Sequence, residues 1–97
     1  MTYKYKAAFE KRLNRLPAAD QERIAETVEQ LVRFFDSRQA PEGLGVKKLF
    51  GSHELGTVFE ARASLAIRLV FGVRSSVVTF LCVGNHDEVK QFIRSFR

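Results

Sequence analysis

The sequence predicts an α+β fold made of two N-terminal helices, an antiparallel meander of three to four strands and a short C-terminal helix. Apolar residues recur at helical spacing up to about residue 36, alternate with polar ones from about residue 46, and return to helical spacing after Asn85. Because helices and strands occupy separate stretches of the chain, we expect the helices on one face of the sheet. The 97 residues have the length of one domain, residues 1–97.

The two N-terminal helices meet at a proline. Apolar residues spaced by four and by three predict a helix over residues 6–16, and they are Phe9, Leu13 and Leu16. Proline is tolerated in the first turn of a helix but breaks its interior, so Pro17 opens a second helix that runs to about Asp36. The apolar face of this second helix consists of Ile24, Val28, Leu31 and Phe35.

A loop and then the strands follow. Residues 37–45 combine a proline, two glycines and polar side chains, which is typical of a surface loop. The alternation beyond it predicts strands over 46–50, 57–62, 65–73 and 76–83. The turns at Ala63–Ser64 and Ser75–Ser76 contain no Asn-Gly or Asp-Gly pair, so their lengths stay open. The last strand is apolar on both faces, which places it inside the sheet.

The chain ends in a helix that starts after Asn85. Asn85 and Glu88 have the spacing of a capping box, in which each side chain accepts a hydrogen bond from the backbone N–H of the other residue. The apolar residues after this box lie on one helix face, and they are Val89, Phe92, Ile93 and Phe96.

The charge favours a polyanionic partner. Sixteen Lys and Arg against eleven Asp and Glu give a net charge of +5, which suits RNA, DNA or an acidic protein. The single cysteine, Cys82, lies in an apolar run and is expected to be a buried strand residue of a protein in a reducing compartment. No apolar run approaches the roughly 20 residues that span a bilayer, and no signal-peptide pattern opens the sequence. We therefore expect a soluble, cytoplasmic protein without a membrane partner.

Most enzyme classes lack their signature here. The sequence contains no P-loop, no Gly-x-Gly-x-x-Gly, no nucleophile elbow and no cluster of Cys and His at metal spacing, so we expect neither a metal nor a cofactor. The remaining candidates are polar residues on or beside the predicted sheet, and they are Lys47, Lys48, Glu60, Arg62, Arg68 and His86.

Arg68 interrupts an otherwise apolar strand. It falls on the face opposite the apolar residues of that strand, which are Leu65, Ile67, Leu69, Phe71 and Val73. A solvated outer face would tolerate an arginine without function, and this interpretation stays open. Arg62 would lie on the same side as Arg68 only if the turn between them has an odd number of residues. Two converging guanidinium groups would stabilise a phosphate, and more strongly a phosphorane.

The two histidines differ in position. His86 would occupy the first turn of the terminal helix, where free N–H groups attract phosphate and the dipole favours the neutral imidazole that a base needs. A plain surface histidine is the alternative interpretation. His53 lies in a loop between Ser52 and Glu54 and is expected to be solvated and inert.

The other candidates also have two interpretations. Lys47 and Lys48 either make the protein more soluble or contact phosphates without reading sequence. Glu60 lies two residues before Arg62 and so on the same face of the predicted strand. Three roles are open for it: it pairs with Arg62, keeps that arginine oriented or acts as a base. Pairing is the expected role.

Several short segments, taken in this order and spacing, carry a family resemblance. They are Leu16-Pro17, Lys47-Lys48-Leu49 with Gly51, Phe59-Glu60-Ala61-Arg62, Ile67-Arg68-Leu69-Val70-Phe71 and Val83-Gly84-Asn85-His86-Asp87-Glu88-Val89. Along nearly its whole length the chain resembles the RelE/ParE toxins of bacterial type II toxin–antitoxin systems. The resemblance implies two helices on a curved antiparallel sheet whose concave side receives messenger RNA in the ribosomal A site.

The resemblance also implies an endoribonuclease. By position, Arg68 looks like the arginine that stabilises the scissile phosphate, and His86 looks like a histidine of one branch of the family. Arg62 and the lysine pair look like supporting phosphate contacts. The implied reaction is a metal-free attack of the RNA 2′-hydroxyl on the adjacent phosphorus. The chain departs from many relatives at Lys90, where they have an aromatic residue, and at the turn 63–66, which lacks their Gly-Asp.

Two other functions are alternatives to the ribonuclease. The first is a ParE-like inhibitor of DNA gyrase, which needs no acid–base residues. The second is a non-catalytic binding module on the same scaffold. In all three cases the resemblance implies a hetero-oligomer with a cognate antitoxin protein that covers the basic surface.

Overall fold

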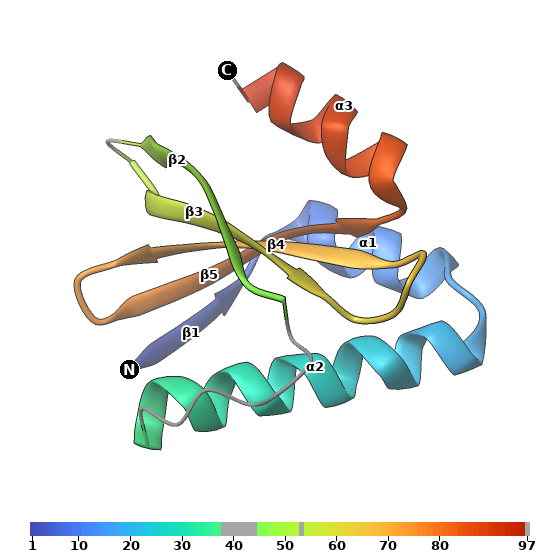
Figure 1. Ribbon diagram of the computed structural model, residues 1–97, viewed down its shortest axis with the longest axis horizontal. Coiled ribbons are helices and arrows are strands. Elements are labelled where there is room, and N and C mark those ends of the chain that lie inside the picture. Colours follow the sequence, from blue (N-terminus) through green and yellow to red (C-terminus); the bar gives the residue numbers. More distant parts are fainter. Residues whose placement is uncertain (38–44, 53, 97) are drawn as a thin grey trace.

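The computed structural model describes residues 1–37, 45–52 and 54–96 (Figure 1). Within these described residues, eight elements follow one another: β1 (Thr2–Tyr5), α1 (Ala7–Arg15), α2 (Ala18–Ser37), β2 (Lys47–Ser52), β3 (Gly56–Arg62), β4 (Arg68–Arg74), β5 (Val77–Gly84) and α3 (His86–Phe96). The predicted loop at 37–45 lies mostly outside the described residues, as does His53. No described helix has both the length and the apolar character that a membrane span needs.

The strands form one five-stranded sheet in the order β1-β5-β4-β3-β2. The expected meander over β2 to β5 is antiparallel, but β1 pairs with β5 in parallel, so the sheet is mixed. The prediction of three to four antiparallel strands is therefore corrected by one strand. Only four residues make up β1, and such a short, mostly exposed edge strand has too little alternation to be recognised from sequence.

The helical hairpin is confirmed. The two helices are separated by Leu16 and Pro17, and the carbonyl oxygen of Pro17 accepts hydrogen bonds from the N–H groups of Asp20 and Gln21. Proline has no N–H of its own to satisfy, so it fits at this helix start. The second helix extends one residue beyond the predicted end, to Ser37.

The third predicted strand starts too early. Residues 63–67 form the turn between β3 and β4, so Leu65 is 90% exposed instead of facing the core. The carbonyl oxygen of Ile67 accepts from the N–H groups of Ala63 and Ser64, and the Ser64 hydroxyl oxygen accepts from the N–H of Ile67. These bonds close the turn before the ladder begins at Arg68.

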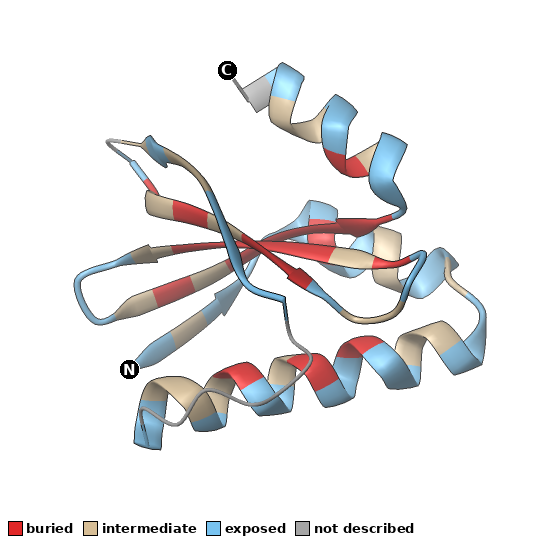
Figure 2. Ribbon diagram, viewed as in Figure 1, coloured by how far each residue is buried: buried red, intermediate tan, exposed pale blue. Residues whose placement is uncertain are grey.

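The helices cover both faces of the sheet, contrary to the expectation of one (Figures 1 and 2). One face packs against α1 and α2 through a cluster of buried residues, which are Phe9, Ile24, Leu31, Ala61, Ile67, Leu69, Phe71, Val78, Phe80 and Val83. The other face packs against α3 through Leu55, Val58, Val70, Leu81, Cys82 and Val89. The chain leaves the last strand at Gly84 and turns α3 onto the face that the hairpin leaves open.

A bulge in β5 explains why that strand is apolar on both faces. Val70 pairs with Cys82, while the next residue, Phe71, pairs with Phe80, so Leu81 is the extra residue. Leu81 and Cys82 consequently both belong to the cluster under α3. Cys82 is fully buried, as predicted, and burial raises the pKa of its thiol.

Candidate active site

The sheet register brings the two candidate arginines together. Arg62 at the end of β3 is the direct partner of Arg68 at the start of β4. The five residues of the turn, 63–67, are an odd number, and directly opposed residues of an antiparallel pair share one face. This is the α3 face, because Arg68 alternates with Leu69, which packs under the helical hairpin. The geometric condition that the sequence left open is met.

Glu60 pairs with Arg68 and not, as expected, with Arg62. The Oε1 of Glu60 lies 3.4 Å from the Nη1 of Arg68, and the side chains are 11% and 26% exposed. Glu60 stands diagonally across from Arg68, because its direct partner on β4 is Val70. Arg62 ends its strand and is exposed, so the buried carboxylate stabilises the more buried guanidinium.

One donor of Arg68 has no acceptor in the part of the chain that the structure describes. Its Nε is buried, and no group of the described residues accepts a hydrogen bond from it. A guanidinium carries five N–H donors in a fixed fork, and a buried donor without an acceptor is costly. The Arg68 side chain as a whole is 26% exposed, so a phosphate can approach the guanidinium from solvent while Nε itself stays covered.

The chain entering β2 lies beside Arg62. Gly45 has a φ of +53°, and a Cβ atom built on it would lie 3.8 Å from the Cβ, Nε and Cζ of Arg62. A backbone in this left-handed region favours glycine. The start of β2 therefore flanks the guanidinium of Arg62.

The start of α3 closes the site on the other side. Gly84 of β5 is the direct partner of Arg68, and the predicted capping box follows it. Asn85 Oδ1 accepts from the N–H of Glu88 at 2.9 Å, and Glu88 Oε1 accepts from the N–H of Asn85 at 3.0 Å. His86 is the exposed first residue of α3. Its Cα lies within about 12 Å of the Arg68 Cα, because two residues and one strand spacing separate them.

The lysine pair does not act as a unit. Lys47 is the direct partner of Glu60 and shares the face of the two arginines, whereas Lys48 opposes Phe59 and points to the other face. Lys90 is exposed on α3, one turn after His86. Arg62, Arg68, Glu60 and Lys47 thus share one face of the sheet, and His86 and Lys90 lie exposed on the helix that follows Gly84.

Glu88 and Gly84 also hold this region together, and the sequence did not single them out for this role. The second carboxylate oxygen of Glu88 accepts a hydrogen bond from Arg12 Nη1 at 3.1 Å, which ties α1 to the start of α3. A Cβ atom at Gly84 would lie 2.9 Å from the Cβ of Glu88, so glycine is required there. The capping-box spacing points to Glu88, but no local signal could reveal a partner 76 residues away.

Comparison with known proteins identifies the fold. No protein-family profile and no curated protein matches the sequence. Solved structures do match the fold. The RelE–RelB complex from Pyrococcus horikoshii OT3 is 23% identical, with 87% of this chain and 92% of that chain covered and a TM-score of 0.66. The RelB–RelE antitoxin–toxin complex from Methanococcus jannaschii is 19% identical, with coverages of 92% and 96% and a TM-score of 0.67.

YafQ from E. coli strain BL21(DE3) is 14% identical, with coverages of 90% and 94% and a TM-score of 0.62. The chain therefore has the RelE-like fold, in agreement with the fold that the sequence segments indicated.

Proposed function

We propose that this chain is the toxin of a type II toxin–antitoxin system and acts as a ribosome-dependent mRNA endonuclease. The observation that carries the proposal is the pair of opposed arginines, one of which is held in place by the carboxylate of Glu60. Fixed donors of this kind stabilise charge that develops on a phosphate during attack. The RelE-like fold of the chain supports the same conclusion.

The proposed reaction is a transesterification within the RNA. The 2′-oxygen forms a bond to the adjacent phosphorus, and the bond from phosphorus to the 5′-oxygen breaks. The products are a 2′,3′-cyclic phosphate, or its opened form, and a 5′-hydroxyl end. A base takes the proton of the 2′-hydroxyl, and an acid gives a proton to the leaving 5′-oxygen.

The residues of the site have separate roles in this proposal. Arg68 binds the scissile phosphate through the exposed part of its guanidinium, and Arg62 contributes a second guanidinium to the phosphorane. His86 transfers protons from its exposed position in the first turn of α3. Glu60 holds Arg68 in position through their ion pair. Lys47 and Lys90 contact phosphates of the bound RNA, whereas Lys48 lies on the other face of β2 and is left out of this role.

The proposed function also defines location and partners. A protein that cuts messenger RNA in the ribosomal A site acts in the cytoplasm, and a toxin of this type needs a cognate antitoxin that forms a hetero-oligomer with it. Two of the solved structures that share the fold are complexes of a toxin with its antitoxin. We expect the antitoxin to cover the basic surface of this chain, which has a net charge of +5.

The test is to map RNA 5′ ends in cells after induction of the wild type and of variants. Induction of the wild type should stop growth and produce new ends inside translated codons. Arg68→Ala should reduce these ends on the order of 10²- to 10³-fold, as expected when a donor to a developing oxyanion is lost. Arg33→Ala, an exposed arginine of α2 far from the site in sequence, is the matched control and should cut like the wild type.

Two outcomes contradict the proposal. Full cutting by the double variant Arg68→Ala/His86→Ala would remove the catalytic roles assigned here. Growth arrest with intact transcripts and inhibited supercoiling by gyrase would assign the chain to the gyrase inhibitors instead. If one of the two residues proves dispensable we expect it to be His86, because Arg68 alone lies within the charged cluster of the sheet.

A further inference from the structure

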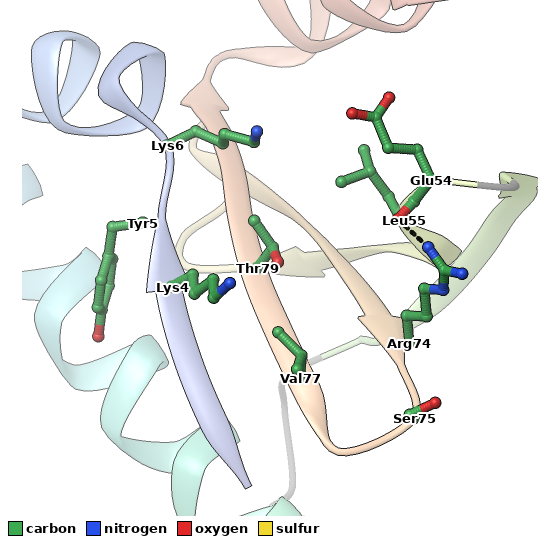
Figure 3. Close-up of a pocket in the computed structure, with 9 residues that line it drawn as sticks. All are labelled: Lys4, Tyr5, Lys6, Glu54, Leu55, Arg74, Ser75, Val77 and Thr79. Atoms are coloured by element: carbon green, nitrogen blue, oxygen red, sulfur yellow. Dashed lines mark hydrogen bonds between the residues drawn. The ribbon is translucent and has the colours of Figure 1, made fainter.

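A second polar surface lies on the α3 face, at the opposite end of the sheet from Arg68. It is a trough of about 590 Å³, and its lining comes from β1, the ends of β4 and β5 and the turn between β2 and β3 (Figure 3). Its floor is Val77 and Thr79 of β5, which alternate with Val78 and Phe80 under the helical hairpin. Thr79 pairs with Lys4 on one side and with Gly72 on the other.

Cations line both walls of this trough. Lys4 and Lys6 lie on the β1 side, about 7 Å apart along the chain. Arg74 lies on the other side, where its Nη1 donates a hydrogen bond to the carbonyl oxygen of Glu54 at 3.1 Å. Figure 3 shows the two lysine chains and the Thr79 hydroxyl extending into the space between the walls. The lining thus has three cations against the single carboxylate of Glu54.

The trough is separate from the candidate active site. Thr79 and Gly84, which mark the two regions on β5, are five residues apart, or about 17 Å along a strand. The apolar cluster under α3 lies between them, including Leu81 and Cys82. A ligand in the trough would therefore not touch Arg68.

The trough lacks the anchors that a protein segment would use. Cores of protein interfaces are built on buried aromatic and aliphatic groups. The floor here offers Val77 beside a hydroxyl group, and Leu55, the aliphatic side chain of the wall, is itself buried in the cluster under α3. Tyr5 turns its ring away from the trough (Figure 3), and this ring stacks on Phe80 with centroids 5.0 Å apart. A spaced set of cations above a floor of Val77 and Thr79 suits a phosphodiester backbone, which is bound by charge without sequence readout.

We infer that this trough is a second phosphate-binding subsite, and that it binds the backbone of single-stranded RNA. The identity of the nucleic acid as RNA rests on the proposed function. The backbone belongs either to a distal part of the strand held at Arg68 or to a separate RNA. Lys4 and Lys6 contact phosphate from one wall and Arg74 from the other.

The experiment measures binding with cleavage removed. A fluorescent 12-nucleotide RNA with 2′-O-methyl groups has no 2′-hydroxyl to attack, so anisotropy titration reports affinity alone. The test variant is Lys4→Gln/Lys6→Gln/Arg74→Gln. The control is Lys11→Gln/Arg23→Gln/Arg33→Gln, which removes the same charge from exposed positions of α1 and α2. Circular dichroism checks that both variants are folded.

The trough variant should weaken binding on the order of tenfold at low salt, and the control should change it far less. The slope of log K against log salt should become shallower by about 2, because three phosphate contacts are lost at about 0.7 each. Equal losses for the two variants would reduce the effect to net charge and overturn the inference. An oligoglutamate peptide of matched charge that binds the trough as tightly as the RNA would overturn it in favour of an acidic protein.

Stoichiometry separates the two sources of the backbone. One oligonucleotide per protein at saturation indicates a strand that spans both regions, and two indicate separate RNAs. The same titration in an Arg68→Ala background isolates the trough, where the triple substitution should still weaken binding. A protein that cuts no RNA in cells but shows this trough-dependent affinity would contradict the proposed nuclease and leave the subsite standing.

Discussion

The face of the sheet under α1 and α2 is filled with aromatic side chains, whereas the face under α3 carries charge at both of its ends. On the first face, Phe80 contacts the rings of Tyr5, Phe9 and Phe71 at centroid distances of 5.0 to 6.2 Å. On the second, a smaller apolar cluster separates the arginine pair from the lysine-lined trough. Both faces belong to the same strands.

The difference shows how a 97-residue chain keeps its main apolar core apart from its charged groups. A small domain has little apolar surface to bury, so its stability depends on packing one face well. Charged groups such as Glu60 and Arg68 contribute little to stability when buried, because desolvation offsets their attraction. On the second face these groups lie outside the main core. The helix α3 covers only the apolar cluster between the arginine pair and the trough.

The largest expected effect is on the hairpin face. Phe80 is fully buried, so Phe80→Ala should lower the free energy of unfolding by about 3–5 kcal/mol, measured by urea denaturation. Phe92→Ala on α3, where the ring is only partly buried, is the matched control and should lower it less. Equal losses for the two variants would mean that the faces share the stability evenly.

The second prediction concerns the ion pair on the α3 face. If Glu60 positions Arg68, Glu60→Ala should lower kcat about tenfold, or about 1.4 kcal/mol, with little change in KM. Glu60→Gln should keep most of the activity, because its amide oxygen still accepts from Arg68 Nη1. Cleavage rates of a model mRNA on ribosomes provide the measurement.

The same pair of variants separates positioning from the alternative role of a base. Loss of a base lowers the rate by about 10²- to 10⁴-fold, and Gln cannot replace it. A Glu60→Gln variant as inactive as Glu60→Ala would therefore assign proton transfer to Glu60 and contradict the positioning role.

The third prediction tests the attachment of α3. Asn85→Ala removes the acceptor for the N–H of Glu88 and should lower the free energy of unfolding by about 1 kcal/mol. Asn85→Asp should keep the cap, because a carboxylate is equally good at this position. Thermal denaturation of the three proteins measures both effects, and an unchanged Tm for Asn85→Ala would show that the box adds nothing to the helix.

The smallest expected effect is a pH dependence under α3. Burial raises the pKa of the Cys82 thiol above the ordinary value of 9.0, so the unfolded chain loses this proton at lower pH than the folded one. The stability that the neutral thiol provides is complete below pH 9.0 and is lost as the pH rises through the folded pKa. Cys82→Ala should therefore show a shallower decline above that pH in urea unfolding.

Tyr3 needs a control in that measurement, because burial and a hydrogen bond to Asp36 raise its pKa above 10.0 in the same sense. Tyr3→Phe removes this second contribution. A decline that is identical in Cys82→Ala and in the wild type, both in the Tyr3→Phe background, would contradict the assignment to the thiol.

The candidate site was only partly readable from the sequence. The strand pattern placed Arg68 on the face away from the core, and the Asn85 to Glu88 spacing predicted the cap. The pairing of Glu60 was assigned to the wrong arginine. Arg62 shares the strand and the face of Glu60, but the partner of Glu60 is Arg68 on the neighbouring strand, which the parity along one strand does not reveal. Lys47 and Lys48 looked like a unit but point to opposite faces, as adjacent residues of a strand must.

The sequence by itself determined the helical hairpin, four of the five strands and the capped last helix, because these depend on local spacing of apolar residues and on turn and cap chemistry. Only the tertiary structure decided that β1 joins the sheet beside β5, that α3 takes the opposite face, and that a five-residue turn opposes Arg62 to Arg68. Each of these depends on the register between segments distant in the chain, and register is set by packing and turn geometry that no single segment encodes.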